Sequence, residues 1–314
     1  MKIVFAEQIG ISTKQKSDFV AEMQQESHIV QFFDAPIKDQ ADLRQRIADS
    51  GILVIGNYPL SESTISLCPN LKLISVAFTG VDHLPVDYCK LKDIAVCNAA
   101  GYSTTAVSEL TICLAISLLR NVVALDLRTR SENSRDSFLG EELQGKTFGI
   151  IGLGAIGTKV AQLATAFGCK VIAHTRTPKI ISNVELVSFN ELMANADIVS
   201  LHIPANSQTV GLISRQAIGL MKPTATLINT ARGTLIDYNA LSAALKNNTI
   251  AGTAVDVYEH EPPIEKGHPL FGAPKTILLP HVGFATTAAI DQRTGIVLEN
   301  IRCWLKGKPQ NVMA

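Results

Sequence analysis

Short apolar runs alternate with helical stretches through the first hundred residues. Residues 17–27 and 39–50 have helical composition, and a loop with cap residues at Gly101 leads into a long helix that we expect to end near Arg120. Alternation of this kind indicates a parallel sheet covered by helices. Four apolar runs have the length of buried strands: 3–6, 52–55, 73–77 and 94–97.

A second alternating series begins at Thr147. Helical stretches separate most of its strands, notably 155–167 and 238–246, and one long helical pattern runs from 286 to 305. The polar segment 121–146 between the two series is predicted to be a helix end followed by an exposed arm, which is either solvated or in contact with a second subunit. Six strands are expected: 148–151, 170–173, 198–201, 225–228, 253–255 and 277–279.

The composition fits a globular chain of about two domains, since 314 residues with 46% apolar and 18% charged side chains can bury sizeable cores. Lys and Arg number 28, as do Asp and Glu, so the formal net charge is zero. This balance argues against a dedicated nucleic-acid binder, which would carry a basic excess. It also argues against an acidic, disordered chain.

Cysteine usage and hydropathy favour a cytoplasmic protein. None of the six cysteines forms a C-x-x-C pair or a cluster with zinc spacing, so we predict free thiols and no metal site. The N-terminal apolar run is too short for a signal peptide. Polar residues interrupt the apolar stretch from Leu110 to Leu119, which we interpret as a buried helix and not as a membrane span.

A glycine-rich loop, Gly152-Leu-Gly154-Ala155-Ile156-Gly157, carries the most specific local signal. It follows an apolar strand and opens an amphipathic helix, which is the context that a dinucleotide-binding loop requires. Gly152 permits the tight turn, Gly154 lets the backbone approach a pyrophosphate, and Gly157 lets the helix pack closely on the strand. The N-terminus of the helix then holds phosphate through unpaired N–H groups and its dipole.

The end of the next strand indicates which dinucleotide binds. A carboxylate there would bond the ribose 2′-OH of NAD, but no carboxylate occurs before Glu185. Arg176 can pair with a 2′-phosphate instead, with Thr175 or Thr177 as hydroxyl donors. We therefore predict a preference for NADP(H), with NAD(H) left possible.

Three later strand ends carry an arginine, carboxylates and a histidine that would converge at one edge of an open sheet. They are Leu227-Ile-Asn-Thr-Ala-Arg232-Gly233, Val255-Asp256-Val-Tyr-Glu259-His-Glu261-Pro262-Pro263 and Leu278-Leu-Pro280-His281-Val-Gly283. With Phe78-Thr-Gly80-Val-Asp82-His, Asn98, the 101–109 stretch, the glycine loop and Leu201-His-Ile-Pro204, they make the whole chain resemble the D-isomer-specific 2-hydroxyacid dehydrogenases, in particular glyoxylate and hydroxypyruvate reductases.

The resemblance implies an α/β fold of two Rossmann-like or flavodoxin-like domains with parallel sheets and an active site in the interdomain cleft. The substrate domain would comprise residues 1–100 and 286–314, and the dinucleotide-binding domain 101–285. The helix that starts near Ser103 would enter the nucleotide domain, and the helix after His281 would return to the substrate domain. The resemblance also implies a homodimer, although the arm from Ser131 to Gly140 lacks the tryptophan that many relatives carry there.

The family's catalytic triad maps onto Arg232, Glu261 and His281. Arg232 would fork onto the substrate carboxylate or bridge to its carbonyl oxygen. His281 would exchange a proton with the oxygen at C2, and Glu261 would orient the imidazole and favour its charged form. Glu261 is preferred over Glu259 because it directly precedes the Pro262-Pro263 pair.

Further contacts follow from the same resemblance. Asp256 would receive the nicotinamide amide, and the backbone N–H groups of the Thr79-Gly80-Val81 loop would hold the substrate carboxylate. The other substrate contacts are expected at Asn98 and Tyr102, alongside Arg232 and His281. The other cofactor contacts are expected at His202, Pro204, Thr209, Thr230, Ala231 and Gly283.

These features predict an oxidoreductase that reversibly reduces small 2-keto acids to D-2-hydroxy acids at a CH–OH group, with glyoxylate or hydroxypyruvate favoured. One alternative is a cofactor-sensing binding protein on the same scaffold. Another is a phosphite dehydrogenase. A formate dehydrogenase is disfavoured, because those relatives replace the histidine-partner glutamate by glutamine. The only partner predicted besides a second subunit is the small-molecule substrate.

Overall fold

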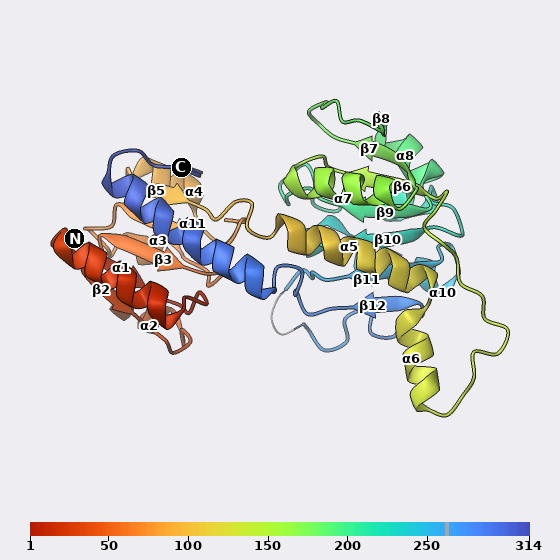
Figure 1. Cartoon of the computed structure of the whole chain (residues 1–314), viewed down its shortest axis with the longest axis horizontal. Helices are drawn as coiled ribbons and strands as arrows, with labels where there is room; N and C mark the ends of the chain where they lie inside the picture. Colours follow the sequence, from red (N-terminus) through yellow and green to blue (C-terminus); the bar gives the residue numbers. More distant parts are fainter. Residues whose placement is uncertain (261–263) are drawn as a thin grey trace. The chain divides into compact units, whose positions relative to one another are not determined.

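The chain folds into two compact units, each built around one parallel β-sheet (Figure 1). The computed structural model describes residues 1–260 and 264–314. The first unit comprises Met1–Ser103 and Ala285–Ala314, and the second Thr104–Phe284. The expected two-domain α/β class with parallel sheets is confirmed.

The sheet of the first unit has the strand order β2-β1-β3-β4-β5, which is the flavodoxin-like order 2-1-3-4-5. All four neighbouring pairs are parallel, and the switch in strand order lies between β1 and β3. The strands are β1 (Lys2–Phe5), β2 (Ile29–Phe32), β3 (Ile52–Ile55), β4 (Leu73–Val76) and β5 (Ala95–Cys97).

Helices cover both faces of this sheet. Residues of α2, α3 and α4 share an apolar core with Val4, Leu53 and Ile74. On the opposite face, the ring of Phe19 in α1 packs edge-on against Phe5, and Ser75 donates a hydrogen bond to the carbonyl of Val297 in α11. The helices are α1 (Thr13–Gln25), α2 (Gln40–Ile47), α3 (Glu62–Ile65), α4 (Val86–Leu91) and α11 (Thr287–Leu305).

The sheet of the second unit has the order β12-β11-β10-β9-β6-β7-β8 and is parallel throughout. Counted from its first strand, this is the Rossmann order 3-2-1-4-5-6 with one strand added. Its switch point lies between β6 and β9. The strands are β6 (Thr147–Ile151), β7 (Lys170–His174), β8 (Val184–Leu186), β9 (Ile198–Leu201), β10 (Thr226–Asn229), β11 (Gly252–Val255) and β12 (Thr276–Leu278).

Two separate cores flank this second sheet. α5 and α7 pack on one face, in front of the strands in Figure 1, and α8, α9 and α10 pack on the other. A short 3₁₀ turn, η1, follows β10. The bounds are α5 (Thr104–Leu119), α7 (Ala155–Ala166), α8 (Phe189–Asn195), α9 (Arg215–Gly219), η1 (Gly233–Leu235) and α10 (Tyr238–Lys246).

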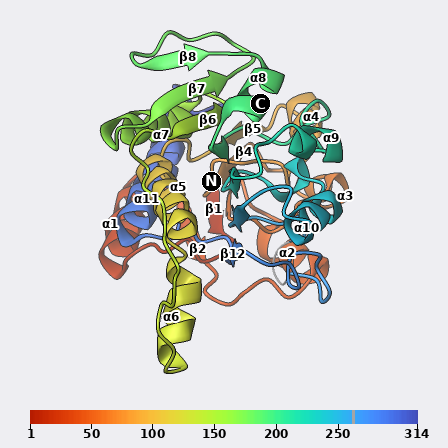
Figure 2. The ribbon, with the colours of Figure 1, turned by 90° about the vertical axis from the view of Figure 1, so that its right-hand side faces the viewer.

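Helix α6 (Val122–Arg130) and the segment after it extend away from the sheet of the second unit, as Figure 1 and Figure 2 both show. No residue of α6 is buried, which agrees with the exposed arm expected there. In the described part of the chain, no single helix is long and apolar enough to cross a membrane; α5 and α6 reach that length only together, with a bend of 60° between them.

The strands that the sequence did not predict, β2 and β8, both lie at sheet edges. Ile29 in β2 is 68% exposed, and two of the three residues of β8 are exposed. These two edge strands bury little apolar surface and lack the continuous apolar run that identified the predicted strands, which include the other two edge strands, β5 and β12.

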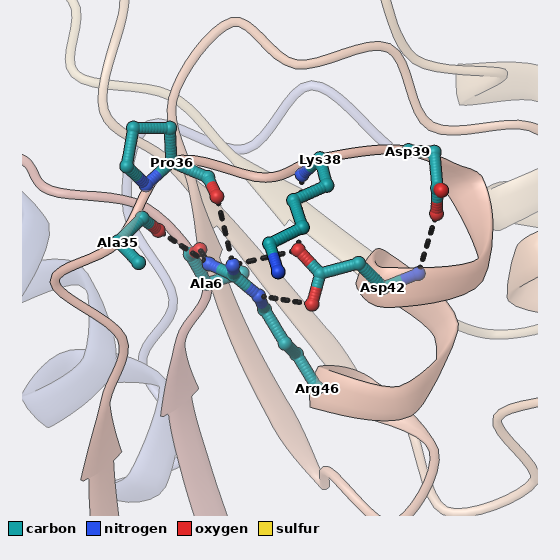
Figure 3. A network of polar contacts seen from close by, with 7 residues as sticks. All are labelled: Ala6, Ala35, Pro36, Lys38, Asp39, Asp42 and Arg46. Carbon is teal, nitrogen blue, oxygen red and sulfur yellow. Dashed lines mark hydrogen bonds and ion pairs between the residues drawn. The ribbon is translucent and has the colours of Figure 1, made fainter.

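A buried guanidinium fastens the loops of the first unit (Figure 3). Arg46 in α2 donates to the carbonyls of Ala6 and Ala35 at 2.9 and 2.7 Å and to that of Pro36 at 2.9 Å, and it pairs with Asp42 at 2.7 Å. A buried charge is tolerated only where such partners replace water. Arg46 therefore fixes the chain after β1 to the chain after β2.

Candidate active site

Residues predicted for the cofactor, together with the predicted catalytic arginine, follow neighbouring parallel strands of the second sheet. The glycine loop follows β6, Arg176 follows β7, His202 follows β9, Arg232 follows β10 and Asp256 follows β11. Because all these strands run in parallel, these residues lie at the same carboxyl edge of one sheet. This edge, at a topological switch point, is where open α/β sheets bind ligands.

The glycine loop requires glycine at two of its three positions for steric reasons. Gly152 has φ +99°, and a Cβ there would lie 2.5 Å from the His202 carbonyl oxygen. A Cβ on Gly157 would lie 1.9 Å from the Gly152 oxygen. Gly154 caps α7 without a side-chain hydrogen bond, and a Cβ there would meet nothing within 4 Å. The exposed start of α7 therefore has room for a pyrophosphate, and the loop fits a dinucleotide.

His202 lies beside this loop with a neutral imidazole. Its Nε2 is 2.6 Å from the Ser200 hydroxyl, and its Cβ would be 3.3 Å from a Cβ on Gly157. Burial lowers the pKa of His202 to about 3. The group therefore adds no positive charge at neutral pH.

The turn after β7 is the expected position for recognition of the ribose. Thr175 donates to the carbonyl of Thr177 at 3.4 Å, and Arg176 is exposed. The first carboxylate beyond this turn, Glu185, belongs to β8 and pairs with Lys170 at 3.0 Å. The turn itself thus presents a cation and hydroxyl groups, and the nearest following carboxylate belongs to the next strand.

A buried asparagine shapes the turn that carries Arg232. Asn229 donates to the carbonyl of Arg232 at 2.8 Å and accepts the N–H of Ala231 at 3.0 Å. The Thr230 hydroxyl lies 3.2 Å from that of Thr111 in α5. These bonds fix residues 230–232 at the end of β10, where the sequence placed two cofactor contacts and the catalytic arginine.

Asp256 holds the turn that contains His281. Its two carboxylate oxygens accept the N–H groups of Val282 and Gly283 at 2.8 and 2.7 Å. His281 itself has φ +56°, and its ring packs edge-on against Phe284 at 5.7 Å. The structure thus brings Asp256 and His281 together at one end of the second sheet.

The other predicted acid, Glu261, lies outside the described residues. Glu259, the neighbouring acid that was not assigned to the triad, contacts a different histidine: its carboxylate lies 3.3 Å from Nε2 of His268. Thr209, a predicted cofactor contact, stabilises its own loop, since its hydroxyl donates to the carbonyl of Pro204 at 2.8 Å.

Five of the predicted substrate residues lie in the first unit, in the loops that follow β4 and β5, whereas Arg232 and His281 belong to the second unit. Buried Asn98 donates to the carbonyl of Thr79 at 2.7 Å, which ties the loop after β5 to the loop after β4. The ring of Tyr102 packs edge-on against Phe78 at 6.4 Å. Within residues 1–260 and 264–314, no acceptor takes the backbone N–H of Thr79, Gly80 or Val81. Three such donors in a row suit a carboxylate.

Two charged residues of the first unit were not singled out in the sequence. Arg293 in α11 is 5% exposed, and its guanidinium lies 4.9 Å from the Phe78 ring. Glu7, directly after β1, accepts the N–H groups of Gly56 and Tyr58 at 2.5 and 3.4 Å. An arginine on the apolar face of the 286–305 helical pattern was the available signal for the first.

Comparison with known proteins decides the family. The model of the NAD-binding domain of D-isomer specific 2-hydroxyacid dehydrogenases matches residues 112–283. The glyoxylate reductase of Thermococcus litoralis is 36% identical over 258 residues, which cover 78% of this chain and 77% of that protein. The chain belongs to the D-isomer specific 2-hydroxyacid dehydrogenase family.

Other members of this oxidoreductase family differ in length and in their named substrates. The D-3-phosphoglycerate dehydrogenase of Methanocaldococcus jannaschii is 39% identical over 274 residues, and the aligned region spans about half of that relative, 52% of its length. A solved acyclic imino acid reductase in complex with NADPH and D-arginine has 30% identity and a TM-score of 0.90, with both chains covered completely.

Proposed function

We propose that this 2-hydroxyacid dehydrogenase reduces small 2-keto acids to D-2-hydroxy acids, with NADP(H) preferred. The observation that supports it most is the gathering of the glycine loop, Arg232, Asp256 and His281 at one edge of the second sheet. The carboxylate-binding loop, residues 79–81, comes from the first unit. A nicotinamide cofactor, when bound, supplies the hydride.

The chain's own residues hold the substrate and manage one proton. The N–H groups of residues 79–81 bind the substrate carboxylate, and Arg232 forks onto that carboxylate or the carbonyl oxygen. His281 donates its proton to the oxygen at C2 and takes it back in the reverse reaction. Glu261 orients the imidazole. Asp256 accepts a hydrogen bond from the amide N–H of the nicotinamide, in addition to fixing the turn.

The cofactor preference rests on Arg176. In the proposal, its guanidinium pairs with the 2′-phosphate of NADP(H), and the Thr175 and Thr177 hydroxyls donate hydrogen bonds to that phosphate. The carboxylate-free turn supports this assignment, since an acidic residue is what would favour the free 2′-hydroxyl of NAD(H). The similar imino acid reductase is likewise described with NADPH.

Glyoxylate and hydroxypyruvate are the favoured substrates, since two of the similar curated proteins are glyoxylate reductases. The full-length likeness to an acyclic imino acid reductase makes a 2-imino acid the second candidate. Both reactions deliver hydride to C2 and place a carboxylate beside it, so the same loop and histidine serve either substrate.

A homodimer is the proposed assembly. A groove of about 380 Å³ between α5 and α7 is lined mainly by apolar side chains, among them Ile112, Ile116 and Leu163. Val122, Val123 and Leu127 on neighbouring α6 are 50%, 46% and 61% exposed. A second copy would cover this surface. Light scattering coupled to size-exclusion chromatography would then report twice the chain mass.

Absorbance at 340 nm tests the proposed function. NADPH and NADH oxidation are measured against glyoxylate, hydroxypyruvate, pyruvate, 2-ketoisocaproate and phenylpyruvate, each with and without an added amine. Turnover on a keto acid, faster with NADPH, supports the proposal, whereas turnover only with the amine favours the imino acid. Silence on the whole panel from protein that binds NADPH contradicts both and points to phosphite oxidation or to a cofactor-sensing role.

A further inference from the structure

We propose that Arg293 is a positioning residue that sets the shape of the carboxylate-binding loop and thereby the affinity for the keto acid. The assignment rests on the proposed function, because the loop's role as a carboxylate binder belongs to it. Every contact that carries the argument lies within the first unit.

Arg293 contacts both aromatic residues that border the substrate loops. Its guanidinium carbon lies 4.9 Å from the Phe78 ring centre and 5.8 Å from that of Tyr102, and it also hydrogen-bonds Tyr102. Phe78 immediately precedes the loop of residues 79–81, and Tyr102 follows Asn98 by four positions. One buried planar cation thus packs against the start of one loop and the end of the other.

The two loops are also fastened directly to each other, so a displacement of either moves both. The N–H of Ala99 donates to the carbonyl of Phe78 at 3.0 Å, and Asn98 donates to Thr79 at 2.7 Å. Asn300, one more residue of α11, donates to the carbonyl of Asn98 at 2.8 Å. Helix α11 therefore supports the carboxylate loop from two points, the ring of Phe78 and the backbone of Asn98.

Arg293 is itself fixed by partners beyond the rings. It donates to the carbonyl of Ile9 at 2.9 Å, and the Thr294 hydroxyl approaches the same oxygen at 3.4 Å. Burial lowers the pKa of Arg293, while Tyr102 and Glu7 oppose that shift. Glu7 thus partly compensates the buried charge, and the guanidinium keeps one orientation.

Residue type matters at this position for geometric reasons. A guanidinium is planar, so it can stack on Phe78 while its edge N–H groups reach Ile9 and Tyr102. A lysine would retain the charge but would lack the flat face and the fork. A glutamine would retain a polar end that is too short for the same set of contacts.

The test compares Arg293→Gln and Arg293→Lys with Arg302→Gln, a matched variant on the same helix. Arg302 also lies against an aromatic ring, Phe19 at 5.6 Å, and pairs with Glu22, but it has no contact with the substrate loops. With saturating NADPH and the best keto acid of the panel, both Arg293 variants should raise KM about tenfold, with kcat changed less and the cofactor Kd unchanged. Arg302→Gln should lower Tm and leave KM as it is.

Amide hydrogen exchange gives a readout that needs no turnover. Faster exchange in the 78–83 segment of the Arg293 variants, with the 52–55 strand and Arg302→Gln as references, is the expected result. If the panel shows no activity, the proposed function fails while this measurement still decides the positioning role. KM and exchange that match those of Arg302→Gln would overturn the inference and leave Arg293 with a purely structural role.

Discussion

The Asp256 carboxylate accepts the backbone N–H of Gly283 at 2.7 Å, and its second oxygen accepts that of Val282 at 2.8 Å. The residue just before this pair, His281, has φ +56°, a left-handed conformation that costs a non-glycine residue about 1 kcal/mol. Two charge-assisted hydrogen bonds to a carboxylate that is 1% exposed oppose this cost. Asp256 therefore helps to fix the turn that carries the imidazole.

Replacement of Asp256 should affect turnover and stability together. Asp256→Asn keeps one good acceptor and loses the charge, so we expect Tm to fall and the unfolding free energy to drop by about 1–3 kcal/mol. Turnover should fall about a hundredfold if the turn then relaxes away from the conformation of His281. Urea unfolding and kcat measured on the same preparation check both parts. A variant with full turnover would show that the turn holds without Asp256.

Two substitutions in the glycine loop should affect different properties, one the stability of the protein and the other the affinity for the cofactor. Gly157→Ala places a Cβ 1.9 Å from the Gly152 oxygen, so the cofactor-free protein should lose about 2 kcal/mol of stability. Gly154→Ala meets open space in the protein, so its stability should change by at most about 1 kcal/mol. Its added methyl group faces the proposed pyrophosphate, however, and the Kd for NADPH should rise about tenfold. Denaturant unfolding and NADPH fluorescence titration separate the two effects.

Arg176 should discriminate between the two cofactors. Arg176→Ala removes the proposed partner of the 2′-phosphate, so KM for NADPH should rise at least about tenfold. KM for NADH, which lacks that phosphate, should stay the same. Lys179→Ala, in the same exposed segment, is the control and should change the ratio less. Equal changes for both cofactors would remove Arg176 from 2′-phosphate recognition.

His202 predicts a dependence of stability on pH. Because burial lowers its pKa in the folded state to about 3, the folded state favours the neutral imidazole. Its contribution is complete above the ordinary pKa of about 6.5 and is lost as the pH falls below that value. Between pH 7 and pH 5, wild type should lose about 1–2 kcal/mol more unfolding free energy than His202→Asn. Parallel pH dependences of the two proteins would contradict the assignment.

The sequence predicted those parts of the fold whose signal is local. Inner strands such as β3 and β9 are buried at every position and appear as uninterrupted apolar runs. The edge strands β2 and β8 have no such run, because their positions are exposed or only half-buried and polar side chains are tolerated there. Gly152 and Gly157 were identifiable because their requirement for glycine arises within one strand–turn–helix segment.

Contacts between distant segments could not be predicted in the same way. The 286–305 pattern predicted a helix, but not that Arg293 would lie on Phe78, more than two hundred positions earlier. Likewise, Asp256 was identified as a cofactor contact, whereas its bonds to Val282 and Gly283 depend on the pairing of β11 with β12. Pairing of this kind follows from the whole sheet and not from any single motif.

The most direct test of the proposed chemistry is the turnover of His281→Gln with the best keto acid of the panel and saturating NADPH. The account predicts that kcat collapses by at least about a hundredfold, because no other group is assigned to protonate the oxygen at C2. The Kd for NADPH should remain at the wild-type value, since His281 is assigned no cofactor contact. Full turnover in this variant would contradict the account, because the proton would then come from another group.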